Sequence, residues 1–569
     1  MLQINSGKLF TREVGRQNEL RGIIYTNLRL GRDGPIETAM GRLQPTSTLR
    51  EAKAVVYELT ERIEAEEKGP GVLVSHGMEP YIQDFSAVLS FALNVVSTPD
   101  YDLASRMTSG KGTLSVATPP DKLVRRVFDN EVWCKPQDEE LLIALAQDLI
   151  ALERKSYLAA MRAIRTYVTG LHRLSDDLEL AYTMLVASIE SLVQEFDGHE
   201  TVWSDYDETK RRKIDRVLNK YEPAIGARVR EVLLEQEHVS LARRFREYVL
   251  STVSSSYFRE EALGQPGPIS RAELPGALRQ AYNLRSQYVH KLKELPKELT
   301  LDRQYGEVVQ ISGNSVLSFQ GLTRLVRHVI RRFVETQPKT DCEPYDYLME
   351  KSGIMSMQMA AQYWIWRSEG LTIQHGMRRL EGFLEQLLPV IQGQEGAALT
   401  DLREMLAKAE SLFDVSTSVE RRPFLALYFL FNHFLSSNEK MDSFEKIRGK
   451  YLAELEDPSV VSMFVHLLFG LVPTWSLSSH QDVLDTYFRE RNKKNKLRVP
   501  QLLETAAILF LAERIRIADQ PTALEKQVAA AVENSPGNRA LLELEAHLDP
   551  VEPIDWRQLL FPQQKAVDE

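Results

Sequence analysis

Cysteine is scarce in this chain of 569 residues, which contains only Cys134 and Cys342. The two lie far apart, and neither belongs to a C-x-x-C pair. This spacing excludes a disulfide framework and a zinc site built from cysteines, and it is typical of a protein from a reducing compartment. We therefore expect a cytoplasmic protein.

Long hydrophobic runs are also absent. The longest stretch without a charged residue, 458–475, is interrupted by His466. It is shorter than the roughly 20 apolar residues that a membrane-spanning helix requires. The stretch 423–434 is shorter still, and the first residues lack the basic start and apolar run of a secretory signal. We interpret both stretches as buried helices and expect a soluble protein without a membrane-bound part.

Positive charge is not in excess, since 70 Lys and Arg residues face 80 Asp and Glu residues, for a formal net charge of −10. A chain with this balance has no general attraction to nucleic acid, so any contact with RNA must come from a local basic patch. The hydrophobic content of 43% is ordinary for a globular protein. The length suggests roughly three or four domains.

Several catalytic motifs are missing. The chain has no G-x-x-x-x-G-K-[ST] phosphate loop, and residues 110–113 (GKGT) lack its spacing. It has no H-E-x-x-H helix, no histidine pair at ligand spacing and no G-x-S-x-G elbow. We therefore expect neither a metal site nor a cofactor.

The pattern of apolar residues predicts a mainly α protein with three regions. They are a small mixed α/β domain at 1–140, a helical bundle at 141–340 with its core at 174–337, and an all-α array at 345–569. The last region alternates apolar helices with turns, as an α-solenoid-like array does, although no strict repeat period is visible. Because such arrays bind proteins along a concave face, we expect this region to bind a protein partner or to sense a trigger.

The first region combines strand and helix signals. Residues 20–30 and 36–49 have the pattern of strands, and 71–76 that of a short buried strand. Residues 49–67 place their apolar residues on one helical stripe, and 84–96 is a second apolar helix. We therefore expect an α/β domain, without a definite topology.

The second region reads as helices throughout, apart from one short strand-like piece. A helical pattern at 138–172 leads into it. The expected elements are then, in order, helices at 178–193, 207–237 with a bend near Pro223, 241–263 and 271–293, the strand-like piece at 306–319, and a closing helix at 320–335.

The most informative stretch is 281–292 (AYNLRSQYVHKL), which places Arg285 and His290 five positions apart near the end of the fourth helix. A histidine titrates near neutral pH and acts as a general acid or base, and the guanidinium fork of arginine suits phosphate oxygens. Together they are the minimum set for cutting RNA without a metal. On a straight helix, five positions turn the two side chains about 140° apart. The alternative is a purely structural role, with a salt-bridged arginine and a histidine packed at a helix end.

This arrangement resembles the HEPN superfamily of small helical bundles, and most closely its ApeA-like branch. The resemblance covers residues 180–335 and rests on an apolar helix with 187–192 (ASIESL), two charged helices, the R-x-x-x-x-H pattern and a basic last helix. It implies a metal-independent endoribonuclease of bacterial antiphage defence or stress response, which leaves 2′,3′-cyclic phosphate and 5′-hydroxyl ends. It also implies a homodimer through the bundle, or a pseudo-dimer with another bundle, in which each site draws on both chains.

Three further positions bear on the resemblance. Glu190 matches an acidic residue often found on the family's first helix, so it is implied to orient the histidine or to pair with Arg285. A surface or ion-paired glutamate is the equal alternative. Ser286 stands where many active members carry Asn or another strongly polar residue, and Leu292 stands where the toxin branch has a tyrosine modified by AMP transfer. That mode of control is therefore not expected here.

A basic helix face is the second feature of the sequence that indicates a function. The closing helix of the bundle carries Arg324, Arg327, His328 and Arg331 at spacings of i, i+3, i+4 and i+7, with Arg332 beside them. Such a face is suited to follow the phosphates of RNA toward the site. The alternative is a solvated face paired with acidic neighbours.

Three functional hypotheses follow. In the first, the bundle cuts RNA, and the flanking regions hold it silent or sense a trigger. In the second, the protein is catalytically silent, the bundle dimerises and the helical array binds a protein. In the third, it is an RNA-binding regulator that uses the basic face without cutting. Loss of His290 separates the first from the second, and charge reversal on the basic face identifies the third.

Overall fold

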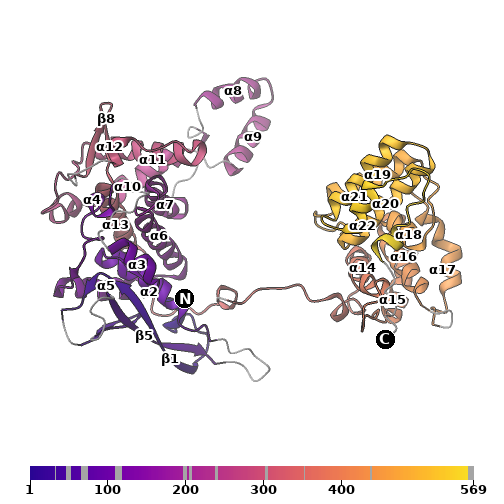
Figure 1. Cartoon of the computed structure of the whole chain (residues 1–569), viewed down its shortest axis with the longest axis horizontal. Helices are drawn as coiled ribbons and strands as arrows, with labels where there is room; N and C mark the ends of the chain where they lie inside the picture. Colours follow the sequence, from indigo (N-terminus) through magenta and orange to yellow (C-terminus); the bar gives the residue numbers. More distant parts are fainter. Residues whose placement is uncertain are drawn as a thin grey trace. The chain divides into compact units, whose positions relative to one another are not determined.

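The structure is a computed structural model that describes residues 1–31, 34–46, 53–65, 75–108, 118–196, 202–203, 208–236, 241–300, 306–351, 353–435 and 439–561. The chain divides into two compact units, Met1–Ser356 and Met357–Glu569 (Figure 1). It is mainly helical, with a small sheet near its start, so the predicted fold class is confirmed. Each unit has its own hydrophobic core.

A five-stranded antiparallel sheet, in the order β3-β4-β5-β1-β6, forms part of the first unit. Its long strands β1 (Val14–Thr26) and β5 (Ala54–Glu64) pair so that Leu20 lies opposite Leu59. The short strands are β3 (Ile36–Thr38), β4 (Gly41–Pro45) and β6 (Ser97–Thr98), and β2 (Leu28–Arg29) pairs separately with β7 (Val132–Trp133). The strand predictions for 20–30 and 36–49 are confirmed over the described residues, whereas residues 71–74 lie outside them.

The helix predicted for 49–67 is wrong, because residues 54–64 form the central strand β5. Both faces of this strand carry buried side chains, so the simple alternation that marks a half-buried strand is lost. Its apolar residues then also fit a helical stripe. The β-branched pair Val55 and Val56 was the local signal that favoured a strand.

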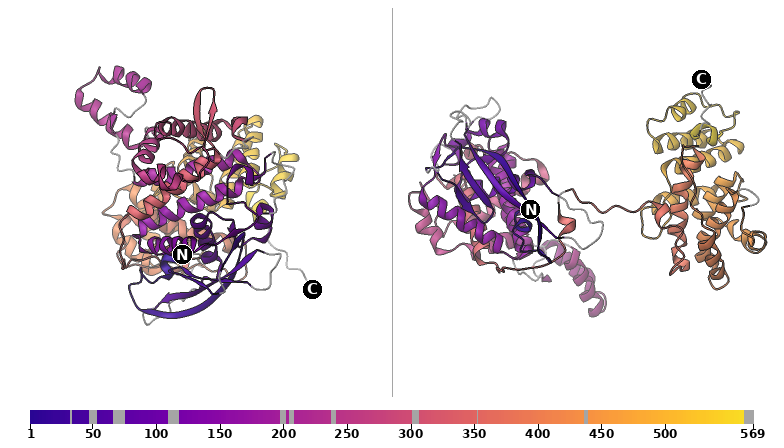
Figure 2. Two further views of the ribbon diagram at one scale, coloured as in Figure 1. Left: turned by 90° about the vertical axis from the view of Figure 1, so that its left-hand side faces the viewer. Right: turned by 90° about the horizontal axis from the view of Figure 1, so that it is seen from below.

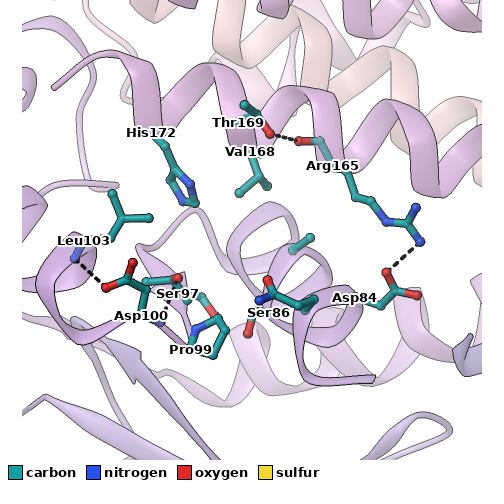
Figure 3. Close-up of a pocket in the computed structure, with 13 residues that line it drawn as sticks. Asp84, Ser86, Ser97, Pro99, Asp100, Leu103, Arg165, Val168, Thr169 and His172 are labelled. Carbon is teal, nitrogen blue, oxygen red and sulfur yellow. Dashed lines mark hydrogen bonds and ion pairs between the residues drawn. The ribbon is translucent and has the colours of Figure 1, made fainter. Parts of the chain in front are cut away.

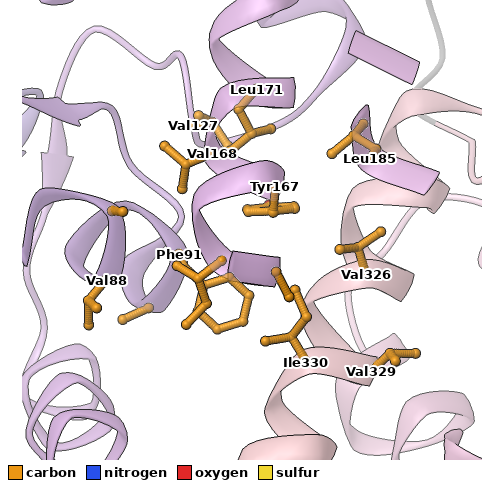
Figure 4. Packing of buried hydrophobic residues seen from close by; sticks show 14 of the residues in the cluster. Val88, Phe91, Val127, Tyr167, Val168, Leu171, Leu185, Val326, Val329 and Ile330 are labelled. Atoms are coloured by element: carbon orange, nitrogen blue, oxygen red, sulfur yellow. The ribbon is translucent and has the colours of Figure 1, made fainter. Parts of the chain in front are cut away.

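Helices cover the sheet and continue into the bundle. Helix α2 (Glu79–Leu93) packs on the sheet, where Phe85 stacks on Tyr57 at 4.3 Å between ring centroids. Helix α6 (Arg154–Arg173) packs on α2, and both α7 (Leu178–Phe196) and α13 (Phe319–Thr336) pack on α6. Figure 4 shows side chains of α2, α6 and α13 meeting at this junction. The predicted helix at 84–96 is therefore confirmed, and that at 138–172 is divided into α5 (Pro136–Ala151) and α6.

One hydrophobic core runs through the whole first unit, from the N-terminal helix α1 (Leu2–Asn5) to α13. The sheet region and the bundle therefore share a core, and the division into domains at 1–140 and 141–340 stays a prediction. Residues 345–356, which the sequence pattern groups with the C-terminal array, belong to the first unit.

The start of the chain is tied to segments far away in sequence. The Lys8 ammonium and the Gln3 amide donate to carbonyls of residues 150–152, where α5 ends. The backbone N–H groups of Glu343 and Tyr345 donate to the carbonyls of Lys8 and Leu9. The segment around residues 343–350 therefore fastens the start of the chain onto the unit, and we call residues 343–350 the strap.

The bundle contains more breaks than its sequence predicts. The single bent helix expected at 207–237 is two helices, because Pro223 has no N–H to donate and disfavours helical backbone at the residue before it. The hairpin that these two helices form stands apart from the bundle (Figures 1 and 2). The remaining elements are α3 (Tyr101–Thr108), α4 (Pro120–Leu123), α8 (Glu208–Leu218), α9 (Pro223–Gln236), α10 (Leu241–Thr252), α11 (Leu274–Lys291), α12 (Lys297–Thr300), β8 (Val308–Ile311) and β9 (Asn314–Leu317).

The second unit is all helical over its described residues. Its apolar stretch 423–434 forms most of helix α16, and the stretch 458–475 contains helix α18. The side chains of both helices are mostly buried, as predicted. A capping box between Thr417 and Glu420 begins α16. Among the described residues, no helix combines the length and apolar character needed to cross a bilayer. The helices are α14 (Gly376–Ile391), α15 (Arg403–Phe413), α16 (Ser418–His433), α17 (Phe444–Tyr451), α18 (Val460–Phe469), α19 (Leu477–Glu490), α20 (Gln501–Ile517), α21 (Pro521–Asn534), α22 (Arg539–Ala546) and α23 (Trp556–Leu560).

Candidate functional site

Helix α11 carries both residues of the R-x-x-x-x-H pattern. Its buried residues recur at helical spacing and face the bundle, where α11 packs against α7 and α10. The helix ends at Leu292, which has the left-handed backbone conformation (φ 49°), four residues before Pro296. His290 and Lys291 lie in the last turn, where the helix dipole favours positive charge.

Arg285 forms an ion pair with Glu190 on the neighbouring helix α7. The Nη2 of Arg285 lies 2.7 Å from Oε2 of Glu190, and the glutamate side chain is almost fully buried. The hydroxyl of Tyr282 donates to Oε1 of Glu190 at 3.3 Å. Burial, followed by the charge of Glu190, raises the pKa of Tyr282 to about 12. The buried carboxylate is therefore paired and hydrogen-bonded, and it fixes the position of Arg285.

His290 does not join this group within one chain. Its side chain is exposed, and among the described residues it has no hydrogen bond or ion pair. The two predicted partners on α11 diverge because the helix is regular from one to the other. Glu190 was expected either to orient the histidine or to pair with Arg285. In the structure it pairs with Arg285.

The basic residues of α13 mostly point inward. Two nitrogens of Arg324 donate to the fully buried Glu307, with Nη2 at 2.8 Å from Oε2, and its guanidinium lies over the ring of Tyr257. His328 is buried, with Nδ1 at 2.9 Å from a carboxylate oxygen of Glu261, and its Nε2 accepts from the N–H of Ser254.

The other three basic residues differ in their surroundings. Arg327 donates to the carbonyls of Phe91 and Ala92 at the end of α2. Arg331 makes no hydrogen bond with a described residue, and Arg332 pairs with Glu335 at 2.6 Å on the surface. The five residues therefore do not form one solvent-facing stripe, and their use by RNA stays a prediction.

A polar hollow of about 360 Å³ lies between α2, β6 and α6 (Figure 3). Arg165 and Asp84 form an ion pair at its wall, at 2.6 Å. The hydroxyls of Ser86 and Ser97 and the Nε2 of His172 are buried without a hydrogen-bond partner among the described residues. Burial lowers the pKa of His172 to about 4, so its ring is neutral at pH 7. The hollow is polar and large enough to hold ordered water.

The sequence patterns did not reveal this hollow. Its residues come from three separate segments, and the only local signal was the spacing of Arg165 and His172 by seven positions on one helix face. Over the ranges that the structure describes, no group of three or more His, Cys, Asp or Glu side chains is placed to hold a metal ion.

Comparison of the chain with protein-family models, with curated proteins and with solved structures gives no match.

Proposed function

We propose that the protein is a metal-independent endoribonuclease that acts as an effector in bacterial antiphage defence or stress response. The observation that supports the chemistry is that Arg285, held by the buried Glu190 of α7, lies on the same helix as His290, whose exposed side chain has no partner among the described residues. The defence role is supported only by the HEPN resemblance. A cytoplasmic location is part of the proposal, and the two free thiols Cys134 and Cys342 support it.

In the proposed reaction, His290 takes the proton of a ribose 2′-OH as that oxygen attacks the adjacent phosphorus. The bond from phosphorus to the 5′ oxygen breaks, and this oxygen takes up a proton from water. Arg285 stabilises the negative charge that builds on the phosphate oxygens. The products are a 2′,3′-cyclic phosphate and a 5′-hydroxyl, and DNA is not cut because it lacks the nucleophile.

A second copy of the chain is proposed to complete the site. Val289 and Leu292, which flank His290 in sequence, are large apolar residues with exposed fractions of 48% and 76%. Exposed apolar residues beside a polar functional group favour a protein interface. In the proposed homodimer, His290 of one protomer faces Arg285 of its partner, which overcomes their divergence on a single helix.

The test uses end-labelled tRNA and mRNA with purified wild-type protein, His290→Ala and the control His547→Ala, all in EDTA. We expect cyclic-phosphate fragments from wild type and from the control, whose histidine is exposed on the second unit. His290→Ala should lower the rate at least about 100-fold, the usual contribution of a general acid or base. Equal cleavage by wild type and His290→Ala would sink the catalytic assignment.

The competing function is a catalytically silent scaffold that dimerises through the bundle and binds a protein along the helical array. The same exposed Val289 and Leu292 favour it, because an apolar interface serves dimerisation whether or not RNA is cut. Sedimentation of wild type and Leu292→Ser decides between them when combined with the RNA assay. The scaffold is supported if wild type is a dimer that Leu292→Ser dissociates, and if wild type cleaves no RNA under any activating condition.

A further inference from the structure

A cavity of about 500 Å³ lies where the end of α2, the segment after α4, the start of α5 and α13 meet. Its walls include two carboxylates, Asp129 and Asp138. Its walls also include the five arginines Arg125, Arg126, Arg324, Arg327 and Arg331. This excess of positive charge is local, since the whole chain carries a net charge of −10. The volume is within the range of small-molecule sites, roughly 300–1,000 Å³.

Arg327 holds its positive charge in the cavity without a carboxylate partner among the residues that the structure describes. Its Nε and Nη2 donate to the carbonyls of Phe91 and Ala92 at 3.1 and 2.9 Å. These carbonyls belong to the last turn of α2, where acceptors have no partner within the helix. Burial, followed by the charge of Arg331, lowers the pKa of Arg327 to about 9, so the guanidinium remains charged at pH 7.

Arg331 lies one turn further along α13 and is the least satisfied of the five. Its Nε is buried without a hydrogen-bond partner, and its guanidinium makes no hydrogen bond to any described residue. Glu261, the carboxylate that most raises its pKa, already pairs with His328. Arg331 is half-buried, and a partly desolvated cation without a hydrogen-bond partner favours an anionic ligand.

Two of the other arginines are already neutralised. Arg324 pairs with Glu307, and Arg126 pairs with Asp138 at 2.9 Å. Arg126 also has a left-handed backbone (φ 70°), which costs about 1–3 kcal/mol for a residue other than glycine and is a form of strain found at ligand sites. Arg125, the third remaining arginine, donates to the carbonyl of Gly264 at 3.5 Å and is not without partners. Arg327 and Arg331 are therefore the two arginines of α13 in the cavity that form no ion pair with a described carboxylate.

We infer that this cavity binds a small phosphate-bearing molecule of nucleotide size, with Arg327 and Arg331 as its phosphate ligands. Guanidinium groups bind phosphate oxygens in pairs of hydrogen bonds, and a phosphate supplies the missing partner of Arg331. Gln265 and Gln320 also line the cavity. The oxygen of the Gln320 amide accepts from the N–H of Arg125, which leaves its NH₂ group for the rest of the ligand. Its size favours a small ligand over an RNA strand. The inference is independent of the proposed ribonuclease.

The test is calorimetric titration of the full chain with AMP, ADP, inorganic phosphate, pyrophosphate and a short single-stranded RNA. We expect a nucleotide or pyrophosphate to bind with a micromolar Kd. Arg331→Gln should weaken this binding at least tenfold, because it removes one of the two proposed phosphate ligands. The matched control is Arg332→Gln, one position along, whose side chain pairs with Glu335 on the surface. The control should change the Kd less than twofold.

Two further readouts keep the inference falsifiable. Without ligand, Arg331→Gln should melt at the same or a higher temperature than wild type, since it removes a half-buried charge that forms no ion pair with a described residue. His290→Ala should bind the ligand as wild type does, which separates this site from the proposed catalytic one. The inference would be overturned if none of the small probes binds, or if only the RNA binds. It would also be overturned if Arg331→Gln and Arg332→Gln weaken binding equally.

Discussion

At the scale of single residues, burial decides which charged groups remain available for chemistry. Glu307 is fully buried and is bound to Arg324, which is only slightly exposed, so the charges of both are already paired. His290 is exposed and has no described partner. The hydrogen-bond partners that a residue finds inside the fold therefore matter more to its role than its position in a motif.

His172 gives the first unit a stability that depends on pH. The unfolded chain binds a proton at this histidine below about pH 6.5, whereas the folded ring stays neutral down to about pH 4. The free energy of unfolding should therefore fall by roughly 3 kcal/mol as the pH is lowered from 6.5 to 4. In His172→Gln this part of the decrease should vanish, as measured by urea unfolding at several pH values.

The control for this experiment is His547→Gln, which replaces an exposed histidine of the second unit. Its pH profile should follow that of wild type. If the profile of His172→Gln also follows wild type between pH 4 and 6.5, then the ring of His172 is protonated in the folded protein, and the polar hollow is more open to water than its burial indicates.

The candidate site could be predicted only in part. The spacing of Arg285 and His290 was visible in the sequence, and Glu190 was named as a possible partner of Arg285. The inward orientation of Arg324 and His328 was not predicted, because their partners Glu307 and Glu261 come from other segments. Helical spacing tells which residues share a face, but it does not tell what covers that face.

At the scale of helices, two glycines at equivalent positions have opposite surroundings. Gly276 is the third residue of α11 and Gly321 is the third residue of α13. A β-carbon at Gly276 would meet no described atom within 4 Å outside its chain neighbours and its own helix backbone, whereas one at Gly321 would lie 2.2 Å from the carbonyl oxygen of Glu307. The close packing of α13 on the segment before β8 therefore depends on glycine.

Substitution of each glycine by alanine should have opposite effects. Gly276→Ala should stabilise the first unit by about 0.5–1 kcal/mol, since alanine favours the helix. Gly321→Ala should destabilise it by about 1–3 kcal/mol, as overpacking does. Urea unfolding of both variants measures the difference, and equal effects of the two substitutions would contradict the packing described for α13.

The helical elements were predicted more reliably than their ends. The helices at 84–96 and 178–193 were found close to their expected positions because their apolar stripes are long. Strand β5 was missed because a strand buried on both faces loses its period. The break before α9 was underestimated, since a proline ends a helix as easily as it bends one.

At the scale of the whole chain, two hydrophobic cores predict two units that unfold separately. Between them, Met355, Met357 and Met359 are exposed, with fractions of 58–77%. We expect limited proteolysis to cut first near these residues and to release fragments close to 1–356 and 357–569. Each fragment should keep a cooperative thermal transition, measured by calorimetry. A first cut within either core, or the loss of both transitions after cleavage, would contradict this division.

The strap around residues 343–350 also sets an order of events during synthesis. The N–H of Glu343 binds the carbonyl of Lys8, and Tyr347 binds Glu64 through its hydroxyl. A ribosome adding roughly 5–20 residues per second reaches the strap about 20 s to a minute after it has made Lys8. The first segment of the chain must therefore wait for its last contacts until most of the unit has been made. For that interval, the nascent first unit needs protection from aggregation, and its folding is completed late in translation.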